Sequence, residues 1–164
     1  MSIRIFATGG TFDEDFDELQ GRFRFRDTHL SEMLGHARCS LDIAIETLMM
    51  IDSLDMSGEQ RAAIVDGCRR CEERRIVVTH GTDTIHDTAR ALAAAELDKT
   101  IVLTGALSPY AFGSSDGLFN LGSALAFVQV LPPGVYIALH GGCERVTGGA
   151  VEPLGAAAAV GAAG

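Results

Sequence analysis

Two short threonine-rich turns have the residue types needed for acyl-transfer chemistry. The first covers residues 7–11 (ATGGT) and the second covers residues 79–84 (THGTDT). Together they supply several hydroxyl groups, one carboxylate at Asp83 and backbone N–H groups that the neighbouring glycines leave accessible. A hydroxyl that attacks an acyl group needs an activating base and donors that stabilise the oxyanion. The turns therefore predict a site that holds a small polar amide or acid.

Each turn follows an apolar run that indicates a β-strand, and helical patterns separate such runs along the chain. Strands that alternate with helices favour a parallel sheet with right-handed crossovers, and ligands bind at the carboxyl ends of its strands. We expect an open, mainly parallel α/β sheet with helices on both faces, in a single Rossmann-like or flavodoxin-like domain. The strands are expected near residues 3–8, 45–51, 75–79, 100–105 and 134–139.

Helix starts are marked by capping patterns. Ser57 is followed three residues later by a glutamine, which predicts a reciprocal capping box. Asp83 or Thr84 is the expected N-cap of the next helix, and Asp116 is expected to cap the third. The helices are expected at residues 57–74, 85–97 and 118–130.

A long polar segment, residues 12–28, interrupts this pattern. Loops of this length in a compact domain are usually functional lids or disordered segments. Its early carboxylates mimic the opening of an EF-hand calcium loop, but that loop requires glycine where this chain has Glu18 and glutamate where it has Arg24. We therefore reject calcium binding and predict a solvated lid that is acidic first and basic afterwards.

Length and composition fit one domain with a continuous core, because the chain has 164 residues of which 47% are hydrophobic. The net charge of −9 argues against nucleic acid and against anionic membrane surfaces as partners. The sequence has neither an apolar run of the ~20 residues that a membrane span needs nor a signal segment at its start. Cytoplasmic localisation is the resulting expectation.

The cysteines and the chain end need separate interpretations. Cys68 and Cys71 have the spacing of a zinc or redox pair, but there is no second pair and they fall late in a helix instead of opening one. Reduced thiols are expected. Residues 148–164 are small and nearly uncharged, so we divide the chain into a domain at 1–147 and a tail at 148–164. The tail is interpreted as a flexible end, or alternatively as an extension that packs on a neighbouring subunit.

The two threonine turns, in this order and spacing, resemble the signatures of the bacterial-type asparaginase/glutaminase family. Residues 51–56 (IDSLDM) are similar to its substrate-carboxylate loop, and residues 104–106 and 115–121 extend the resemblance. It covers roughly residues 3–140. Family members usually carry a second, smaller domain, so the resemblance implies a short-chain form that corresponds to the N-terminal domain only.

The resemblance also implies roles for matching residues. Thr11 occupies the position of the primary nucleophile, and Thr82 that of the second catalytic hydroxyl. Asp83 resembles the residue that binds the substrate α-amino group, and Ala106 the residue whose backbone carbonyl receives the substrate amide. His80 occupies a position that the family uses structurally. The other substrate-binding residues implied are Gly10, Asp52, Ser53, Asp55 and Gly81.

Two departures from the family pattern leave the catalytic base open. The family places a tyrosine on the loop after the first turn, but residues 20–26 contain none, and the only lysine, Lys99, does not match the position of the family's lysine. Arginine supplies charge but is not a usable base. The candidate substitutes are Arg145, Arg22, Arg24 or Arg26 for the charge, Tyr110 for a hydroxyl relay, and Glu144 for a glutamate that relatives send across a dimer interface.

We therefore predict an amidohydrolase that converts L-asparagine, or L-glutamine, to the acid and ammonia through a threonine acyl-enzyme. No metal or cofactor is implied, and a homo-oligomer is expected. The alternative is a sensor or regulatory module that keeps an amino-acid pocket but has lost turnover. The missing tyrosine and lysine motivate that alternative.

Overall fold

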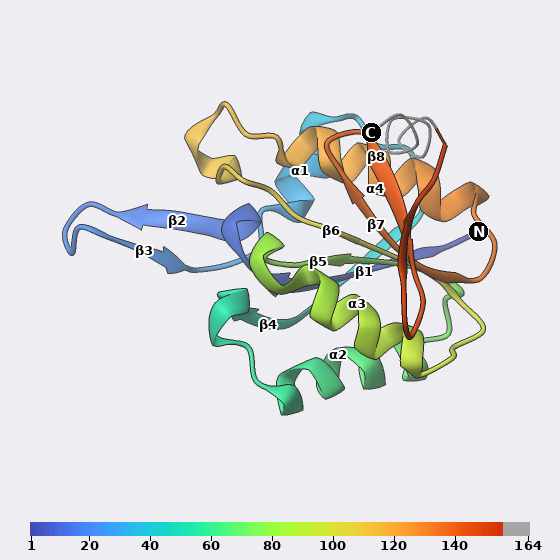
Figure 1. The fold of residues 1–164 in the computed structure, drawn as a ribbon. Helices are drawn as coiled ribbons and strands as arrows, with labels where there is room; N and C mark the ends of the chain where they lie inside the picture. The colour runs from blue at the N-terminus through green and yellow to red at the C-terminus, as the bar shows by residue number, and fades with distance from the viewer. Residues whose placement is uncertain (156–164) are drawn as a thin grey trace, which may run out of the picture.

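A seven-stranded sheet forms the centre of the computed structural model, which describes residues 1–155 (Figure 1). The sheet combines five parallel strands with an antiparallel extension at one edge, as predicted for a mainly parallel α/β domain. From one edge to the other its strands are β4 (Ile43–Ile51), β1 (Ile3–Gly9), β5 (Arg75–Thr79), β6 (Thr100–Thr104), β7 (Gly134–Leu139), β8 (Gly142–Val146) and β9 (Val151–Pro153).

The order of the parallel strands creates a switch point between β1 and β5. Numbered along the chain, these five strands lie in the order 2-1-3-4-5, which is the flavodoxin-like arrangement. The chain leaves β1 towards one edge to form β4, and it then returns to form β5 on the other side of β1. A crevice opens at such a point because the connections diverge to opposite sides, and ligands bind there.

Two helices cover each face of the sheet (Figure 1). α1 (Leu30–His36) and α4 (Gly117–Val130) pack on one face, and α2 (Gly58–Arg70) and α3 (Ile85–Ala94) pack on the other. Side chains of the central strands alternate between these two cores, so Ile5 belongs to the first and Phe6 to the second. This two-residue period buries both faces, which explains why the strands are apolar runs.

The predicted capping box at the start of α2 is confirmed. The Gln60 backbone N–H donates to Ser57 Oγ at 3.2 Å, and Ser57 N–H donates to Gln60 Oε1 at 2.8 Å. Two backbone donors that the helix leaves unpaired are thereby satisfied.

Replacement of Ser57 by alanine is expected to lower the free energy of unfolding by about 1 kcal/mol, because one of these bonds is lost. Urea denaturation measures the change. Ser40→Ala is the matched control, since Ser40 is exposed and lies outside the helices and strands. An equal decrease in the free energy of unfolding in both variants would show that the capping box does not stabilise the protein.

The other two predicted caps are wrong. Thr84 precedes α3, but its hydroxyl donates to the Ser53 carbonyl at 2.9 Å instead of capping the helix. Asp116 precedes α4, yet its carboxylate accepts from the Leu107 and Ser108 N–H groups. In each case a neighbouring loop offers a partner that competes with the helix end. α2 and α3 also end earlier than predicted, at Arg70 and Ala94.

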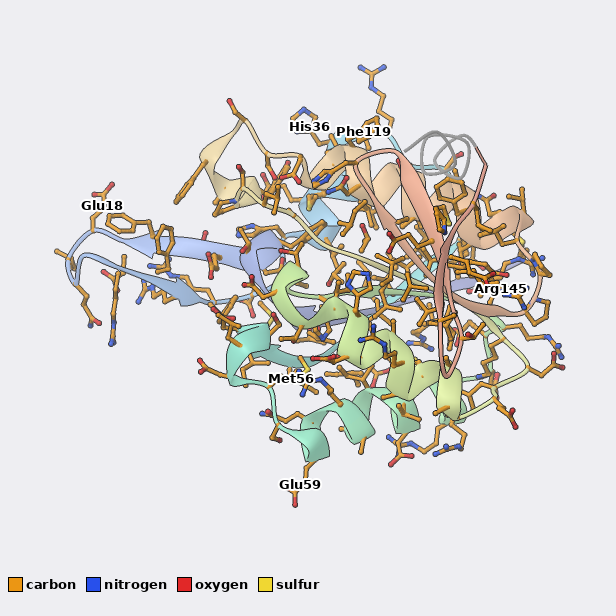
Figure 2. All side chains as sticks on the ribbon, viewed as in Figure 1. Glu18, His36, Met56, Glu59, Phe119 and Arg145 are labelled. Carbon is orange, nitrogen blue, oxygen red and sulfur yellow. The ribbon has the colours of Figure 1, made fainter. Side chains whose placement is uncertain are left out.

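The predicted lid at residues 12–28 is largely a β-hairpin and not an unstructured loop. β2 (Glu14–Asp17) pairs with β3 (Arg22–Phe25), and the hairpin extends beyond the sheet with Glu18 at its far end (Figures 1 and 2). The acidic strand lies against the basic strand, and Asp17 and Arg24 form an ion pair at 2.9 Å. The charge pattern that suggested a solvated loop therefore supports cross-strand pairing.

A buried carboxylate closes the base of this hairpin. Asp13 Oδ1 accepts from the Thr28 hydroxyl at 3.0 Å and from the His29 N–H at 2.9 Å. Burial raises the pKa of Asp13, against the opposing effect of these bonds. Asp13 belongs to a short 3₁₀ turn, Thr11–Asp13, so the hairpin is anchored directly beside Thr11.

The chain beyond residue 147 continues the sheet. β9 lies inside the segment predicted as a tail and pairs antiparallel with β8, while Leu154 packs against the core beneath α1 and α4. This part of the predicted flexible tail is ordered, because β8 offers a free edge for pairing. The rest of that prediction, residues 156–164, lies outside the described residues. Within residues 1–155, no helix is long and apolar enough to cross a membrane.

All four cysteines are free. Burial raises the pKa of Cys68 to about 12 and that of Cys143 to about 11, so both thiols stay protonated at neutral pH. Cys71 directly follows the last residue of α2. A protonated, buried thiol is a poor nucleophile and a poor metal ligand. Within residues 1–155, no cluster of three or more histidine, cysteine or acidic side chains is arranged to hold a metal ion.

Candidate functional site

The carboxyl ends of four adjacent strands carry the residues predicted to form the site. Thr11 follows β1 and Ser53 follows β4, while Thr82 and Ala106 follow β5 and β6. Because β4, β1, β5 and β6 are consecutive in the sheet, these segments meet along one edge. The switch point between β1 and β5 places the two threonine turns next to each other.

Three glycines allow the turns to touch. A Cβ atom on Gly10 would lie well under 3.0 Å from the Gly81 nitrogen, and one on Gly81 would lie 2.5 Å from Ser53 Oγ. A Cβ atom on Gly105 would collide with the His80 carbonyl oxygen. Only glycine permits such approaches, so Gly10 and Gly105 pack against neighbouring backbone and Gly81 packs against the Ser53 side chain.

Hydrogen bonds between the strand ends fix the same arrangement. The Gly10 N–H donates to the Ile51 carbonyl at 3.0 Å, which ties the first turn to β4. The Thr8 hydroxyl donates to the Thr79 carbonyl at 2.7 Å, which ties it to β5. The His80 N–H donates to the Thr104 carbonyl at 2.9 Å and links the second turn to β6.

The predicted site residues differ in exposure. Thr11 and Thr82 are partly exposed, which a residue that contacts substrate requires. Asp83 and Asp55 are exposed, and Asp52 is partly exposed. The buried members of the predicted site are Gly10, Ser53, Gly81 and Ala106.

The Ser53 hydroxyl is buried without a hydrogen-bond partner among residues 1–155. Ser53 is only 1% exposed, and its Oγ faces Gly81 of the second turn. A buried hydroxyl without a partner costs about 1–3 kcal/mol, so such groups are rare and are often completed by a ligand or water. The loop after β4 therefore holds an unused polar group against the second turn.

His80 has a structural role in the second turn. Its Nδ1 lies 2.8 Å from the Gly81 carbonyl, which accepts only, so Nδ1 carries the proton. Nε2 then accepts from the Thr88 hydroxyl at 2.7 Å. Burial lowers the pKa of His80, which keeps the ring neutral in this tautomer. Both nitrogens are engaged, so the ring fixes the turn and is not free to act as a base.

This burial predicts a pH dependence of stability. The pKa of His80 lies below its unfolded value of about 6.5, so the unfolded chain binds a proton first as the pH falls. The stability contributed by neutral His80 is present above that pH and is lost below it, by up to about 1.4 kcal/mol per pH unit. Urea denaturation between pH 7.5 and 5.5 should show a smaller loss for His80→Gln than for the unmodified protein. His36→Gln, at an exposed histidine, is the control and should retain the full loss.

The candidate substitutes for the missing tyrosine, lysine and glutamate have other positions or partners. Arg145 lies opposite Tyr136 in the register of β7 and β8. It is away from the end of the sheet that carries the threonine turns (Figure 2). Tyr110 contacts His36 Nδ1 at 3.3 Å. Glu144 Oε2 lies 3.0 Å from His86 Nε2. The loop arginine Arg24 is paired within the hairpin, as described above.

A cavity of about 490 Å³ lies between the hairpin and the loop after β4. Three carboxylates line it, from Glu14, Asp52 and Asp55, together with the guanidinium of Arg24. Burial and the charge of Asp52 raise the pKa of Glu14. The excess of negative charge makes this cavity unsuitable for a substrate carboxylate and suitable for an ammonium group. Asp52 and Asp55 thus lie beside the threonine turns but line a different surface from that of buried Ser53.

Comparison with known protein families decides what this arrangement is. The family model described as "Asparaginase, N-terminal" matches residues 2–151. The chain belongs to the asparaginase family. The match spans strands β1 to β8, both threonine turns and the hairpin, so the resemblance seen in the sequence is confirmed.

Individual relatives of this asparaginase-family chain agree in fold but are longer. It is 29% identical to the L-asparaginase of Thermococcus kodakarensis over 143 residues, covering 84% of this chain and 44% of the relative. The structure of the thermostable L-asparaginase from that organism superposes with a TM-score of 0.77 at 26% identity, over 94% of this chain and 51% of the other. One component of the glutamyl-tRNA(Gln) amidotransferase of Aeropyrum pernix is 33% identical over 148 residues, which are 85% of this chain and 35% of the relative. The chain spans about half or less of the length of these relatives.

Two polar residues at this edge of the sheet had no predicted role in the site. The Asn120 amide donates to the Gly105 carbonyl at 2.8 Å, and His140 Nε2 lies 2.9 Å from Asp116 Oδ2. Asn120 is the one fully buried polar side chain of α4, in which Ser123 and Gln129 are partly exposed. An isolated amide in such a helix is a signal that the sequence does contain, since buried polar groups need partners. His140 had no comparable signal, because it lies in the turn between β7 and β8.

Proposed function

We propose that this chain is an amidohydrolase that converts L-asparagine to L-aspartate and ammonia through a threonine acyl-enzyme. The observation that carries the proposal is the direct contact of the two threonine turns at the β1/β5 switch point. Thr11 and Thr82 come from neighbouring strands, and Gly10 packs against Gly81 between them. Membership of the asparaginase family supports the reaction class.

In the proposed reaction, the Thr11 hydroxyl attacks the side-chain amide carbon. A C–O bond to Thr11 forms, the C–N bond breaks, and the hydroxyl proton is delivered to the nitrogen, which leaves as ammonia. Water then attacks the ester, one of its protons returns to Thr11, and aspartate is released. Thr82 orients this water. Backbone N–H groups at the glycine-rich turns are the donors suited to stabilise the oxyanion in both steps.

The remaining predicted residues bind the substrate. The carboxylate of Asp83 is exposed beside Thr82 and suits the α-ammonium group. The unpartnered Ser53 hydroxyl, facing Gly81, suits the α-carboxylate, and Gly10 and Gly81 allow the turns to approach closely around it. The Ala106 carbonyl receives the amide N–H, and Asp52 and Asp55 shape the wall beside the hairpin. No metal or cofactor takes part.

An amino-acid-binding module without turnover is the second candidate. It is favoured by the engagement of Tyr110 with His36 and of Glu144 with His86, which leaves neither side chain free to assist Thr11. This candidate keeps the same pocket and the same contacts to the substrate. It differs only in lacking an effective base.

The test is ammonia release from L-asparagine and from L-glutamine by the purified protein, with L-aspartate binding measured by calorimetry. Both amides are needed because the relatives include an L-asparaginase and a component of a glutamyl-tRNA(Gln) amidotransferase. Turnover of L-asparagine supports the amidohydrolase. Aspartate binding without turnover of either amide supports the sensor, and the absence of both overturns the two candidates together.

We also propose a cytoplasmic homo-oligomer that engages neither nucleic acid nor membranes. The net charge of −9 disfavours polyanions, and exposed apolar side chains such as Phe119 and Val130 on α4 are suited to contact another copy. Light scattering at working concentration should report a mass above that of one chain. A monomer would remove the oligomer from the proposal.

A further inference from the structure

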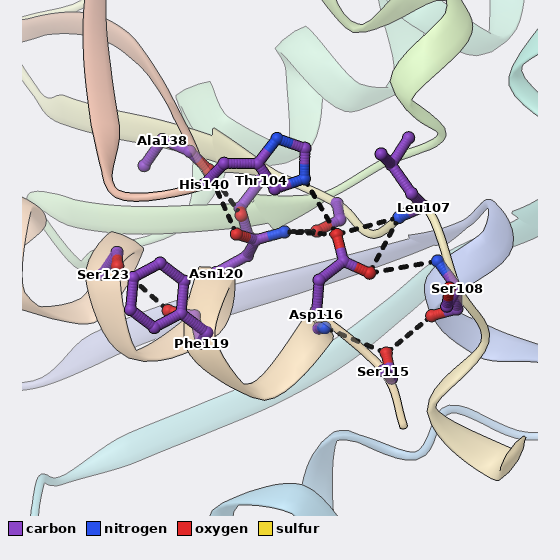
Figure 3. Close-up of polar contacts among 12 residues, drawn as sticks. Thr104, Leu107, Ser108, Ser115, Asp116, Phe119, Asn120, Ser123, Ala138 and His140 are labelled. Carbon is purple, nitrogen blue, oxygen red and sulfur yellow. Dashed lines mark hydrogen bonds and ion pairs between the residues drawn. The ribbon is translucent and has the colours of Figure 1, made fainter. Parts of the chain in front are cut away.

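A polar cluster lies behind the loop that follows β6 (Figure 3). Two of its three side chains come from the start of α4, and the third comes from a turn 20 residues further along the chain. Asp116 precedes α4, Asn120 lies in the first turns of α4, and His140 lies in the turn between β7 and β8. Asp116 and Asn120 bond the backbone of residues 105–108, the loop that carries Ala106, and His140 bonds both of these side chains.

Asn120 joins this loop to the β7–β8 turn. Its Nδ2 donates to the Gly105 carbonyl at 2.8 Å and to Asp116 Oδ2 at 3.1 Å, which uses both amide hydrogens. Its Oδ1 accepts from the His140 N–H at 2.8 Å. Asn120 is 0% exposed, so its own polar atoms depend on these partners and not on solvent. Removal of any one partner would leave a buried polar group unpaired.

Asp116 holds the next residues of the same loop. Its carboxylate accepts from the Leu107 N–H and the Ser108 N–H, each at 3.0 Å, and lies 2.9 Å from His140 Nε2. Burial acts to raise the pKa of Asp116, but the N–H bonds outweigh it and the pKa is lowered, so the group is a carboxylate at neutral pH.

Capping of α4 does not account for the cluster. The Asp116 side chain makes no capping bond, and the Gly117 N–H at the start of the helix instead donates to Ser115 Oγ at 2.9 Å. Leu107 and Ser108 have exposed side chains, although Ala106 and Pro109 on either side are buried, so packing contributes little to holding these two residues themselves. The hydrogen bonds of Asp116 are therefore directed at the loop and not at the helix.

The held loop adjoins the second threonine turn. Gly105 lies against the His80 carbonyl, and a Cβ atom placed on it would be 3.2 Å from Thr82 Cγ2. A shift of Gly105 away from this contact would also move the next residue, Ala106. Gly105 has no side chain of its own, and the hydrogen bond from Asn120 to its carbonyl ties it to α4.

We propose that Asp116, Asn120 and His140 are positioning residues that hold residues 105–108 against the Thr82 turn and so place the Ala106 carbonyl to receive the substrate amide. This inference rests on the proposed function, because it names what orients the substrate in that reaction. His140 is the outer member of the set. It fixes Asp116 with its ring and Asn120 with its backbone N–H, and so links the β7–β8 turn to the site.

The experiment compares Asp116→Asn, His140→Ala and His140→Gln with the unmodified protein. A displaced substrate-orienting group lowers kcat more than it raises KM, by up to about 10²-fold for a shift of 1 Å. We expect kcat for L-asparagine to fall about 10²-fold in Asp116→Asn and about tenfold in His140→Ala, with little change in KM. His140→Gln keeps an N–H donor on its side chain and should recover most of the activity.

The control is Ser123→Ala, which removes an α4 hydroxyl that donates to the Phe119 carbonyl of its own helix at 2.9 Å. It should keep the kcat and the thermal midpoint of the unmodified protein. Folded Asp116→Asn and His140→Ala variants with unchanged kcat would overturn the proposal. If Asp116→Asn does not fold, the comparison of His140→Ala with His140→Gln tests the proposal instead. Equal kcat in these two variants would also overturn the proposal.

L-Asparagine binding separates this inference from the proposed function, because asparagine carries the amide N–H that the Ala106 carbonyl would receive. If the unmodified protein binds asparagine but turns over neither amide, the proposed reaction fails, and weaker asparagine binding by Asp116→Asn and His140→Ala than by Ser123→Ala still supports positioning. Unchanged binding in all three variants overturns positioning. A protein that neither binds asparagine nor releases ammonia overturns both proposals.

Discussion

Thr11→Ala is expected to abolish ammonia release from L-asparagine, with kcat falling by at least about 10³-fold. Removal of a covalent nucleophile eliminates the step that forms the acyl-enzyme, and what remains is the contribution of binding and oxyanion donors. Thr11 is partly exposed at the end of β1, so the loss of its hydroxyl and methyl groups should leave the fold intact. A coupled assay for ammonia, with the thermal midpoint of each variant, measures both effects.

Two further variants make the assignment specific. Thr11→Ser retains a hydroxyl and should keep measurable turnover, whereas Thr47→Ala, at an exposed threonine on β4, should behave like the unmodified protein. If Thr11→Ala keeps full activity and Thr82→Ala loses it, the nucleophile lies on the second turn and the proposed acyl-enzyme at Thr11 is wrong. A fall in both single variants is the expected result, because Thr82 orients the water of the second step.

The central strands could be predicted because their environment has a simple signature. β1, β5 and β6 are covered by helices on both faces, and continuous apolar runs are the consequence. The hairpin of β2 and β3 has no such signature. Its pairing depends on contacts across the two strands, such as Asp17 with Arg24 and Phe16 with Phe23 at 5.5 Å between ring centroids. Each strand alone is short and charged, so it has the pattern of a loop.

The antiparallel strands β8 and β9, of which β9 forms the sheet edge, were not predicted for a related reason. β8 carries Glu144 and Arg145 in its middle, and β9 has only three residues and ends in Pro153. Short, charged strands that contain proline are typical of sheet edges, where they discourage pairing with other chains. The shortness, charge and proline that prevent pairing at an edge also make such strands difficult to predict from the sequence.

The site could be predicted as far as it depends on strand ends. Thr11 and Thr82 each follow a recognisable strand, and the strand order then brings them together. The Asp116, Asn120 and His140 cluster depends instead on how α4 packs against the β7–β8 turn. His140 lies 20 residues from Asn120, and no spacing rule connects a helix start to a turn at that separation. Asp116 therefore had the sequence pattern of a helix cap, although its side chain bonds the neighbouring loop.

The contact between the two threonine turns leads to the second large effect, expected from Gly10→Ala. Gly10 has φ of 78°, in the left-handed region, and its added Cβ would collide with the Gly81 backbone. The backbone strain costs about 1–2 kcal/mol, and overpacking against rigid backbone costs about 1–3 kcal/mol more. We expect the free energy of unfolding to fall by about 3 kcal/mol or more, which lowers the thermal midpoint by about 6–12 °C.

Gly113→Ala is the matched control for this variant, because Gly113 has φ of 85° but no atom within 4 Å of its added Cβ. It should lose only the strain contribution of about 1–2 kcal/mol and keep full turnover. Gly10→Ala should instead lose turnover about 10²-fold even at temperatures where it remains folded, because the collision separates Thr11 from Thr82. Equal losses of stability in the two variants would mean that the turns are not held in contact in solution. The site would then lack the close approach on which the proposed division of roles between Thr11 and Thr82 depends.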